Sequence, residues 1–177
     1  GNAEMKYLLV IDMQNDFISQ ALGTPEALGI VEPVCRLIRG FDGDVIYTRD
    51  THRENYLETQ EGGKLPVPHC IEGTAGWQIC GEVAACMSPG AAVVDKTTFG
   101  AYSLPKILLE KSGGEPPEEI HLAGLCTDIC VISNAMICKA AFPEASIIVH
   151  SDCCAGVTPE SHRTALVAMD ACQIEIR

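Results

Sequence analysis

Short apolar runs recur along this 177-residue chain, and stretches with helical spacing separate them. Runs of Val, Ile and Leu with almost no polar residues are typical of strands that are buried on both faces of a parallel sheet. Alternation of such strands with helices indicates the same arrangement. We therefore expect an α/β protein, a three-layer α/β/α sandwich with a six-stranded parallel sheet. The predicted strands cover residues 7–11, 44–48, 91–95, 119–123, 146–150 and 173–176.

The segments between these strands predict helices that pack on the sheet. Gly40 and the Ser-Gly-Gly run at 112–114 are stop signals, and Pro159 is typical of a helix start. No repeat or linker interrupts the pattern, so we expect one domain over residues 5–177. Residues 1–4 are interpreted as a tag remnant and an N-terminal tail. The predicted helices cover residues 30–38, 76–87, 103–111, 127–141 and 159–171.

Charge and hydropathy exclude several classes of function. The formal net charge is −12 at pH 7, which repels phosphate backbones and argues against nucleic-acid binding. No apolar run approaches the ~20 residues of a membrane-spanning helix, so no membrane contact is expected. The first residues also lack the basic and apolar regions of a signal peptide. We therefore expect a cytoplasmic protein.

The ten cysteines form no C-x-x-C pair of the kind found in zinc ribbons and thioredoxin-like sites. A disulfide framework is not expected in a chain that is not secreted. Most of these cysteines are interpreted as small, buried apolar residues in reduced form. Cys130 is the exception, because of its position in the chain.

Reactive side chains follow the predicted strands at the points where the strands end. In a parallel α/β sheet, ligands bind beyond the carboxyl ends of the strands, near the point where the strand order reverses. The residues that follow the strands are therefore the candidates for a site. They are Asp12, Asp50, His52, Lys96, the segment 126–130 and Asp152.

Cys130 lies in segment 124–131 (GLCTDICV), where a predicted strand gives way to a helix. The N–H groups and the positive dipole end of a first helical turn lower the pKa of a thiol. The same N–H groups can hold an oxyanion, and the Thr127 hydroxyl is expected to cap the helix. Inert cysteines also occur at helix starts, so this segment alone leaves both interpretations open.

Asp12 and Lys96 are the candidate partners of this cysteine. Asp12 leaves a strand that should be central, and the resulting desolvation raises the pKa of a carboxyl group and suits it to proton transfer. Lys96 would balance the thiolate and carboxylate charges. A loop-capping carboxylate and a solvated lysine are the alternative interpretations of these two residues.

Asp50, His52 and His69 form a second candidate set. An Asp-x-His pair on an extended segment presents both side chains on one face. A histidine that arrives on a proline-stiffened loop would complete a facial set suited to zinc, iron or manganese. Ordinary surface polar residues are the alternative. His121 and His150 are expected to be packing residues within strands, and His162 a surface or capping residue.

Together, these segments resemble the isochorismatase-like cysteine hydrolases, and most closely their nicotinamidase/pyrazinamidase branch. The matches occur in order along nearly the whole chain. They are the catalytic-aspartate segment 11–17 (IDMQNDF), the metal-ligand segments 48–52 (TRDTH) and 68–74 (PHCIEGT), the catalytic-lysine segment 95–99 (DKTTF), the nucleophile segment 124–131, and the C-terminal stretch 151–162.

The resemblance implies a catalytic triad of Cys130, Asp12 and Lys96 that hydrolyses a small amide through a thioester. The backbone N–H groups of Cys126 and Cys130 would form the oxyanion hole, and this family often has a cis peptide bond at the position of Leu125–Cys126. The implied reaction converts nicotinamide and water into nicotinate and ammonia.

The resemblance also implies one divalent metal, with zinc favoured over iron or manganese, held by Asp50, His52 and His69. In nicotinamidases this metal binds the pyridine nitrogen of the substrate. Leu125 and the aromatic residues Phe17 and Trp77 are the expected substrate-binding residues. A homo-oligomer is a further expectation from the family.

Two departures from the family pattern bear on the substrate. Residues 53–68 lack the tryptophan that many nicotinamidases carry, and Cys126 replaces an alanine-type residue in the nucleophile turn. One alternative is therefore an enzyme of the same fold that hydrolyses another small amide or a ureido or carbamoyl compound. A second alternative is a non-catalytic binding or redox-buffering protein, which the ten cysteines would suit.

Overall fold

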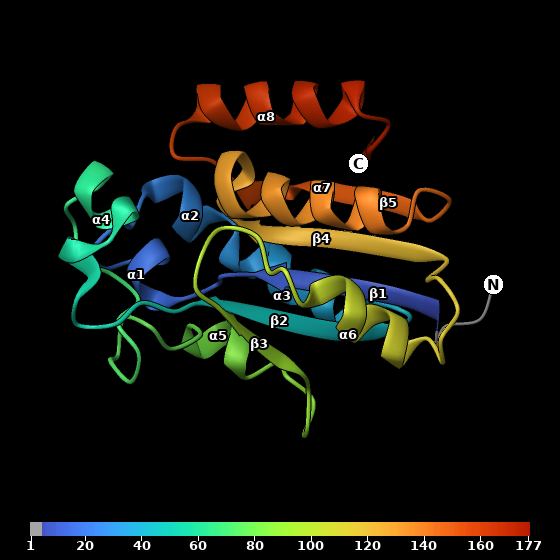
Figure 1. The fold of residues 1–177 in the computed structure, drawn as a ribbon, viewed down its shortest axis with the longest axis horizontal. Helices are drawn as coiled ribbons and strands as arrows, with labels where there is room; N and C mark the ends of the chain where they lie inside the picture. Colours follow the sequence, from blue (N-terminus) through green and yellow to red (C-terminus); the bar gives the residue numbers. More distant parts are fainter. Residues whose placement is uncertain (1–4) are drawn as a thin grey trace.

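The computed structural model of the protein describes residues 5–177, so the expectation for residues 1–4 lies outside the described residues. A six-stranded parallel sheet with strand order β3-β2-β1-β4-β5-β6 forms its centre (Figure 1). This confirms the predicted α/β fold with its parallel sheet. The strands are β1 (Lys6–Ile11), β2 (Asp44–Asp50), β3 (Val93–Lys96), β4 (Glu119–Leu125), β5 (Ser146–Ala155) and β6 (Glu175–Ile176).

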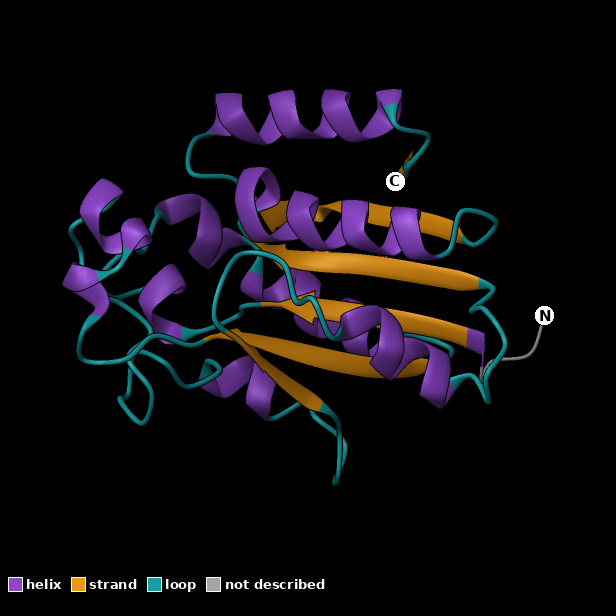
Figure 2. Ribbon diagram, viewed as in Figure 1, coloured by secondary structure: helices purple, strands orange, loops and turns teal. Residues whose placement is uncertain are grey.

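Helices cover both faces of the sheet (Figure 2), and this explains why β1 carries a continuous apolar run. Tyr7, Leu9 and Ile11 pack on the side of α6, α7 and α8. Leu8 and Val10 pack on the opposite side, toward α2, α3 and α5. The helices are α1 (Asn15–Ile18), α2 (Pro25–Gly29), α3 (Val31–Gly40), α4 (Gln60–Lys64), α5 (Gly81–Ala84), α6 (Leu104–Lys111), α7 (Ile132–Ala141) and α8 (Pro159–Ala171), with a 3₁₀ turn η2 (Tyr56–Glu58) and a π-helical turn η3 (Thr127–Val131).

Helix α8 begins and ends at the predicted residues. Thr158 accepts a hydrogen bond from the Ser161 N–H, the Ser161 hydroxyl completes the capping box, and Pro159 occupies the first helical position. A helix whose start is fixed by such local contacts can be located from sequence, because its signal lies within a few residues.

The predicted helix over residues 76–87 is wrong for most of its length, since only α5 is helical there. Ile79 pairs with Gln14 in an isolated β-bridge, and the Cys80 N–H donates to the Met13 carbonyl. These contacts with the chain beyond β1 override the local helical spacing. Residues 53–68, for which no helix was predicted, contain η2 and α4.

The strand order reverses at β1, which has β2 on one side and β4 on the other. A crevice at the carboxyl ends of β1 and β4 is the expected ligand position in such a sheet. Close approach of these two strands requires Gly124, because a Cβ atom there would lie 2.1 Å from the Ile11 carbonyl oxygen. Gly124 also has φ of +125°, which an L side chain rarely adopts.

Among residues 5–177, no helix is both long enough and apolar enough to cross a membrane. All ten cysteines lie in this described part of the chain and are free thiols.

Candidate active site

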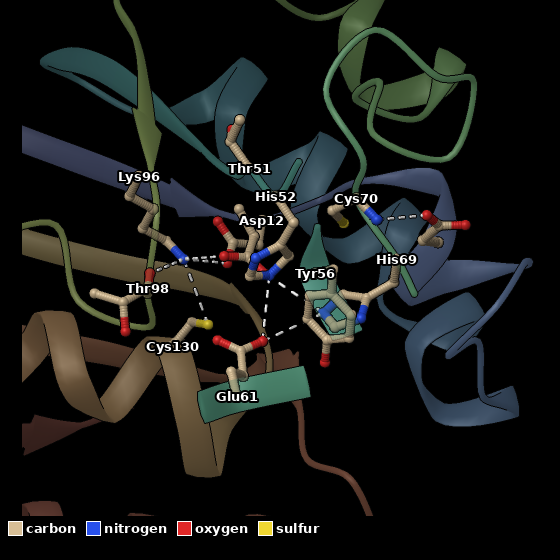
Figure 3. A network of polar contacts seen from close by, with 12 residues as sticks. Asp12, Thr51, His52, Tyr56, Glu61, His69, Cys70, Lys96, Thr98 and Cys130 are labelled. Carbon is tan, nitrogen blue, oxygen red and sulfur yellow. Dashed lines mark hydrogen bonds and ion pairs between the residues drawn. The ribbon is translucent and has the colours of Figure 1, made fainter. Parts of the chain in front are cut away.

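Asp12, Lys96 and Cys130 come from three different strand ends and meet in one buried cluster (Figure 3). Lys96 Nζ lies 2.6 Å from Asp12 Oδ2 and 3.5 Å from Cys130 Sγ. The Thr98 carbonyl oxygen accepts a further hydrogen bond from Lys96 Nζ at 3.1 Å. The structure thus brings together the three residues that the sequence predicted to act together.

Two contacts with β2 fix Asp12 at the end of β1. The Thr48 hydroxyl donates to Asp12 Oδ1 at 2.7 Å, and the Asp12 N–H donates to the Thr48 carbonyl at 3.2 Å. Asp12 has φ of 49°, in the left-handed region that non-glycine residues seldom occupy. Such backbone conformations persist where the surroundings fix them, often at functional sites.

Burial and charge together set the protonation states in this cluster. Burial raises the pKa of Asp12, although the attraction of Lys96 opposes this effect. Burial alone would lower the pKa of Lys96, but Asp12, Cys130 and Asp50 together raise it above its ordinary value. The ammonium group of Lys96 therefore stays charged, and Asp12 is a stronger proton acceptor than an exposed aspartate.

The pKa of Cys130 departs from the sequence-based expectation. Burial raises it well above the ordinary thiol value, and the nearby Asp12 carboxylate adds to the shift, while Lys96 opposes it. The helix start was expected to lower this pKa, but these closer influences outweigh it. Cys130 is thus a neutral thiol in the resting site and needs a base to remove its proton.

Cys130 lies in the π-helical turn η3, which follows β4 directly. The Cys126 carbonyl accepts hydrogen bonds from the N–H groups of Ile129 and Val131, the residues on either side of Cys130. The peptide bond between Leu125 and Cys126 is cis, as the family resemblance implied. The expected cap by Thr127 is wrong, because its hydroxyl instead bonds His162 Nδ1 at 2.6 Å.

A second polar cluster lies beside this triad and contains Asp50, His52, Glu61 and His69 (Figure 3). Their ligand atoms all lie within 4.8 Å of one another. His52 Nε2 is 2.9 Å from Asp50 Oδ2 and 3.2 Å from Glu61 Oε2. His69 Nε2 is 3.6 Å from that same Asp50 oxygen. The three predicted residues are therefore neighbours, with Glu61 as a fourth.

Glu61 was not predicted from the sequence. It lies on α4, in the segment between His52 and His69 for which no helix was predicted. Many acidic residues in this chain would have looked equally suitable, because nothing in the local sequence sets Glu61 apart. Only the path of the chain around η2 and α4 brings its carboxylate to the two histidines.

Backbone pairing and one side-chain contact orient the histidines. The His52 N–H donates to the Cys70 carbonyl, and this places the 69–72 segment beside β2. His69 Nδ1 lies 2.7 Å from the Val67 carbonyl oxygen. A donor at Nδ1 leaves the Nε2 lone pair free for a ligand, a common arrangement for metal-binding histidines.

The segment that follows β1 forms hydrogen bonds with the backbone of the second cluster. The Gln14 side chain accepts from the Asp50 N–H and donates to the Asp50 carbonyl, both at 2.8 Å. The Asp16 carboxylate accepts from the Cys70 N–H at 2.7 Å, next to His69. One short segment therefore carries Asp12 and also holds the backbone at Asp50 and next to His69.

The second cluster has the composition of a transition-metal site. Two imidazole nitrogens and two carboxylates suit zinc, iron or manganese. Asp50 Oδ1 is buried and has no hydrogen-bond partner within the described chain, although Lys96 Nζ lies 3.7 Å away. Burial would raise the pKa of Asp50, but the neighbouring imidazoles of His52 and His69 and the charge of Lys96 hold it below its usual range. An ionised, under-bonded carboxylate of this kind is a suitable metal ligand.

A cavity of about 720 Å³ opens onto both clusters. Apolar side chains form much of its wall. The lining includes Phe17, Leu65, Phe99, Leu125, Ile129 and Val157, together with Asp50, His52, Glu61, His69, Cys126 and Cys130.

The predicted substrate-binding residues divide into two groups. Phe17 and Leu125 line the cavity, and the Phe17 ring meets the His69 ring edge-on at 5.5 Å between centroids. The structure places Trp77 elsewhere, with the Arg49 guanidinium 3.7 Å above its ring and its Nε1 donating to the Thr51 hydroxyl. Trp77 is not part of the described cavity lining, because these contacts hold its ring against β2.

The remaining histidines lie outside the cavity lining. His121 is buried, and its ring bonds His150 and Glu119, both at 2.8 Å. This agrees with the expectation that His121 and His150 are packing residues. His162, near the start of α8, makes the hydrogen bond to Thr127 described above.

The family model of the Isochorismatase domain matches residues 6–177 of this chain. The chain belongs to the isochorismatase family. An uncharacterised isochorismatase family protein of Bacillus subtilis, PncA, is 32% identical over 176 residues, covering 91% of this chain and 92% of that protein. The nicotinamidase of Saccharomyces cerevisiae is 30% identical over 178 residues, covering 75% of this chain and 80% of that enzyme.

The fold of the chain also resembles that of a solved structure. The pyrazinamidase of Pyrococcus horikoshii, crystallised in complex with zinc, aligns with a TM-score of 0.83 and 26% identity over 98% of both chains. The family match and the nicotinamidases among the relatives identify the chain as an amide hydrolase. Both the family and the enzyme class expected from the sequence are confirmed.

Proposed function

We propose that this enzyme deamidates nicotinamide to nicotinate and ammonia through a thioester on Cys130. The observation that carries the proposal is the joint opening of the two clusters onto one cavity. The nucleophile Cys130 and the donors Asp50, His52 and His69 line the same cavity. Nicotinamide has an amide and a ring nitrogen that can engage both clusters at once. Relatives named as nicotinamidases support the same substrate.

In the proposed first step, the Asp12 carboxylate takes the proton of the Cys130 thiol. Its raised pKa favours this transfer, and the charged Lys96, 3.5 Å from the sulfur, stabilises the thiolate that forms. The thiolate attacks the amide carbonyl carbon, and a carbon–sulfur bond forms. The negative charge moves from Asp12 to Cys130 in this step, and Lys96, which contacts both groups, stabilises it in either position.

The tetrahedral intermediate carries an oxyanion, which we assign to the backbone N–H groups of Cys126 and Cys130. Asp12 then returns its proton to the amide nitrogen, the carbon–nitrogen bond breaks, and ammonia leaves. Asp12 next takes a proton from water, which attacks the thioester carbonyl and releases the carboxylate product. The thiol of Cys130 regains its proton at the end of the cycle.

Asp50, His52 and His69 would hold the divalent metal, with Glu61 as a further ligand, and zinc is our first choice. When bound, the metal supplies a Lewis-acid position for the ring nitrogen and so aligns the amide with Cys130. The protein residues contribute the remaining orientation. Phe17 offers an aromatic edge beside His69, and Leu125 offers an apolar contact in the cavity wall.

A different small amide, or a ureido or carbamoyl compound, is the second candidate substrate. Two observations favour it over nicotinamide. The cavity of about 720 Å³ leaves space for a larger molecule, and Trp77 stacks with Arg49 instead of a substrate ring. The same chemistry at Cys130 would apply to such a compound.

Ammonia release from nicotinamide tests the proposal. Zinc-loaded wild-type protein is compared with Cys130→Ala and with a matched control, Cys138→Ala, in which a buried thiol of α7 outside the cavity is removed. We expect activity to disappear in Cys130→Ala and to persist in the control. A folded, zinc-loaded wild type without activity on nicotinamide would refute the substrate, and ureido and carbamoyl compounds would then be assayed.

A further inference from the structure

A single buried side chain joins the loop that follows β3 to the helix that follows the Cys130 turn. Asn134 lies in the first turn of α7 and is completely buried. Its Nδ2 donates to the Cys130 carbonyl at 2.8 Å and to the Phe99 carbonyl at 3.1 Å, and its Oδ1 accepts from the Ala101 N–H at 2.8 Å. An amide side chain has two N–H donors and one acceptor oxygen, so each of these groups has a partner.

The loop of residues 97–101 connects these contacts to the reactive cluster. It begins directly after Lys96, and Lys96 Nζ donates back to the Thr98 carbonyl of the same loop at 3.1 Å (Figure 3). The same Nζ lies 3.5 Å from Cys130 Sγ. Asn134 therefore holds the carbonyl that follows the acceptor of the Lys96 ammonium group, and it also holds the backbone carbonyl of the cysteine.

The 97–101 loop also packs closely against α7. A Cβ atom added at Gly100 would lie 2.5 Å from Ile137 Cδ1, so the glycine permits this close approach of the loop backbone to the helix. The two loop bonds of Asn134 lie on either side of Gly100. Residues 97–99 line the cavity. The loop is thus part of the cavity wall and also the anchor of the Lys96 side chain.

We propose that Asn134 is a positioning residue, which holds the 97–101 loop so that the Lys96 ammonium group stays beside the Cys130 sulfur. This role rests on the proposed function, in which Lys96 stabilises the Cys130 thiolate. Without the amide, the loop loses its two hydrogen bonds to α7 and shifts, and the acceptor of Lys96 shifts with it. A small displacement of a group that stabilises the reacting atom lowers turnover strongly, even when the changed residue lies outside the cavity.

Two variants separate the bond within the helix from the bonds to the loop. Asn134→Ala loses all three hydrogen bonds. In Asn134→Ser the hydroxyl can still donate to the Cys130 carbonyl four residues earlier, as Ser133 does to Ile129 at 2.6 Å, but it has no amide to bond the loop. With zinc-loaded protein and nicotinamide, both variants should lower kcat by about 10–100-fold and change KM by less than about threefold.

Ser133→Ala is the matched control on the same helix. It removes a side-chain hydrogen bond to the carbonyl four residues earlier and no bond to the loop, so its kcat should stay within about twofold of the wild type. Phe99→Ala should give the opposite division, with KM raised several-fold and kcat nearly unchanged, because the backbone carbonyl that Asn134 holds remains. Circular dichroism and urea unfolding confirm that each variant is folded under the assay conditions.

Alkylation by iodoacetamide gives a readout that needs no substrate. Mass spectrometry locates the label in tryptic peptide 112–139, which contains Cys126, Cys130 and Cys138. Cys126 lines the same cavity as Cys130, so the ratio of their rates separates the reactivity of Cys130 from access of the reagent. This ratio should fall several-fold in both Asn134 variants, because Lys96 no longer stabilises the thiolate as well, and it should be unchanged in Ser133→Ala.

An unchanged or higher alkylation ratio in folded Asn134→Ala would overturn the proposal, and so would an equal fall in Ser133→Ala. Wild-type behaviour of Asn134→Ser would also overturn it, since the bond within the helix would then suffice. If the wild type left nicotinamide intact while the alkylation differences persisted, the proposed substrate would be wrong and the role of Asn134 would stand.

Discussion

Replacement of Gln14 by alanine should weaken both the fold and the proposed metal site. The Gln14 side chain is fully buried and makes three hydrogen bonds of 2.8 Å, two with the backbone of Asp50 and one with the carbonyl of Trp77. The variant leaves one N–H and two carbonyl groups in the interior without these partners. Each stranded polar group costs about 1–3 kcal/mol, and water that enters the space recovers part of this.

We therefore expect Gln14→Ala to lower the free energy of unfolding by roughly 3–5 kcal/mol. Since Asp50 is a proposed ligand, we also expect zinc affinity to fall by about 10–100-fold, the usual effect of losing a group that orients a metal ligand. Urea unfolding monitored by circular dichroism gives the first quantity. Competition with a chromogenic chelator gives the second.

Asn15→Ala is the matched control for this prediction. Asn15 is the adjacent residue and donates a single, exposed hydrogen bond to the Ala75 carbonyl at 2.8 Å. Its loss should cost about 1 kcal/mol or less and leave zinc affinity unchanged. If Gln14→Ala unfolded at the same urea concentration as Asn15→Ala, or bound zinc like the wild type, the orienting role of Gln14 would be refuted.

Three further predictions follow from other contacts. Lys96→Met should reduce ammonia release at least ~100-fold and destabilise the fold by about 3–5 kcal/mol, because Asp12 loses its buried partner; near-normal turnover would contradict this. Gly124→Ala should cost more than about 3 kcal/mol in thermal unfolding, whereas Gly29→Ala, with open space around its added Cβ, should be near neutral. Burial lowers the pKa of His150 to about 4, so the unfolded state binds more protons between pH 4 and 6.5. Stability should therefore fall by about 1–3 kcal/mol as pH drops through that window, and His150→Gln should flatten the dependence.

The sheet and the meeting of Asp12, Lys96 and Cys130 could be predicted from the sequence, because their signals are local. The continuous apolar run of β1 reflects burial on both faces, and such a strand in a parallel sheet directs its carboxyl end toward the ligand side. Asp12 follows β1, Lys96 ends β3 and Cys130 lies in the turn η3 after β4, so the strand assignments alone bring them to one edge. Asp50 ends β2 and His52 follows it, so the same reasoning placed these two residues at that edge.

Other features depend on contacts between distant segments, and the sequence alone did not reveal them. Glu61 joins the two histidines only because η2 and α4 fold back over the end of β2. Residues 76–80 are not helical despite the helical spacing of their sequence, because Ile79 and Cys80 pair with the chain beyond β1. Trp77 turns from the cavity because Arg49 and Thr51 hold its ring.

The protonation state of Cys130 shows the same division. The sequence correctly placed this thiol at a helix start, where the dipole favours the thiolate. The tertiary structure then buried it beside the Asp12 carboxylate, and that surrounding raises its pKa instead. Local sequence determined which groups meet at the edge of the sheet, while the depth of burial and the charges around each group were decided by packing between segments far apart in the chain.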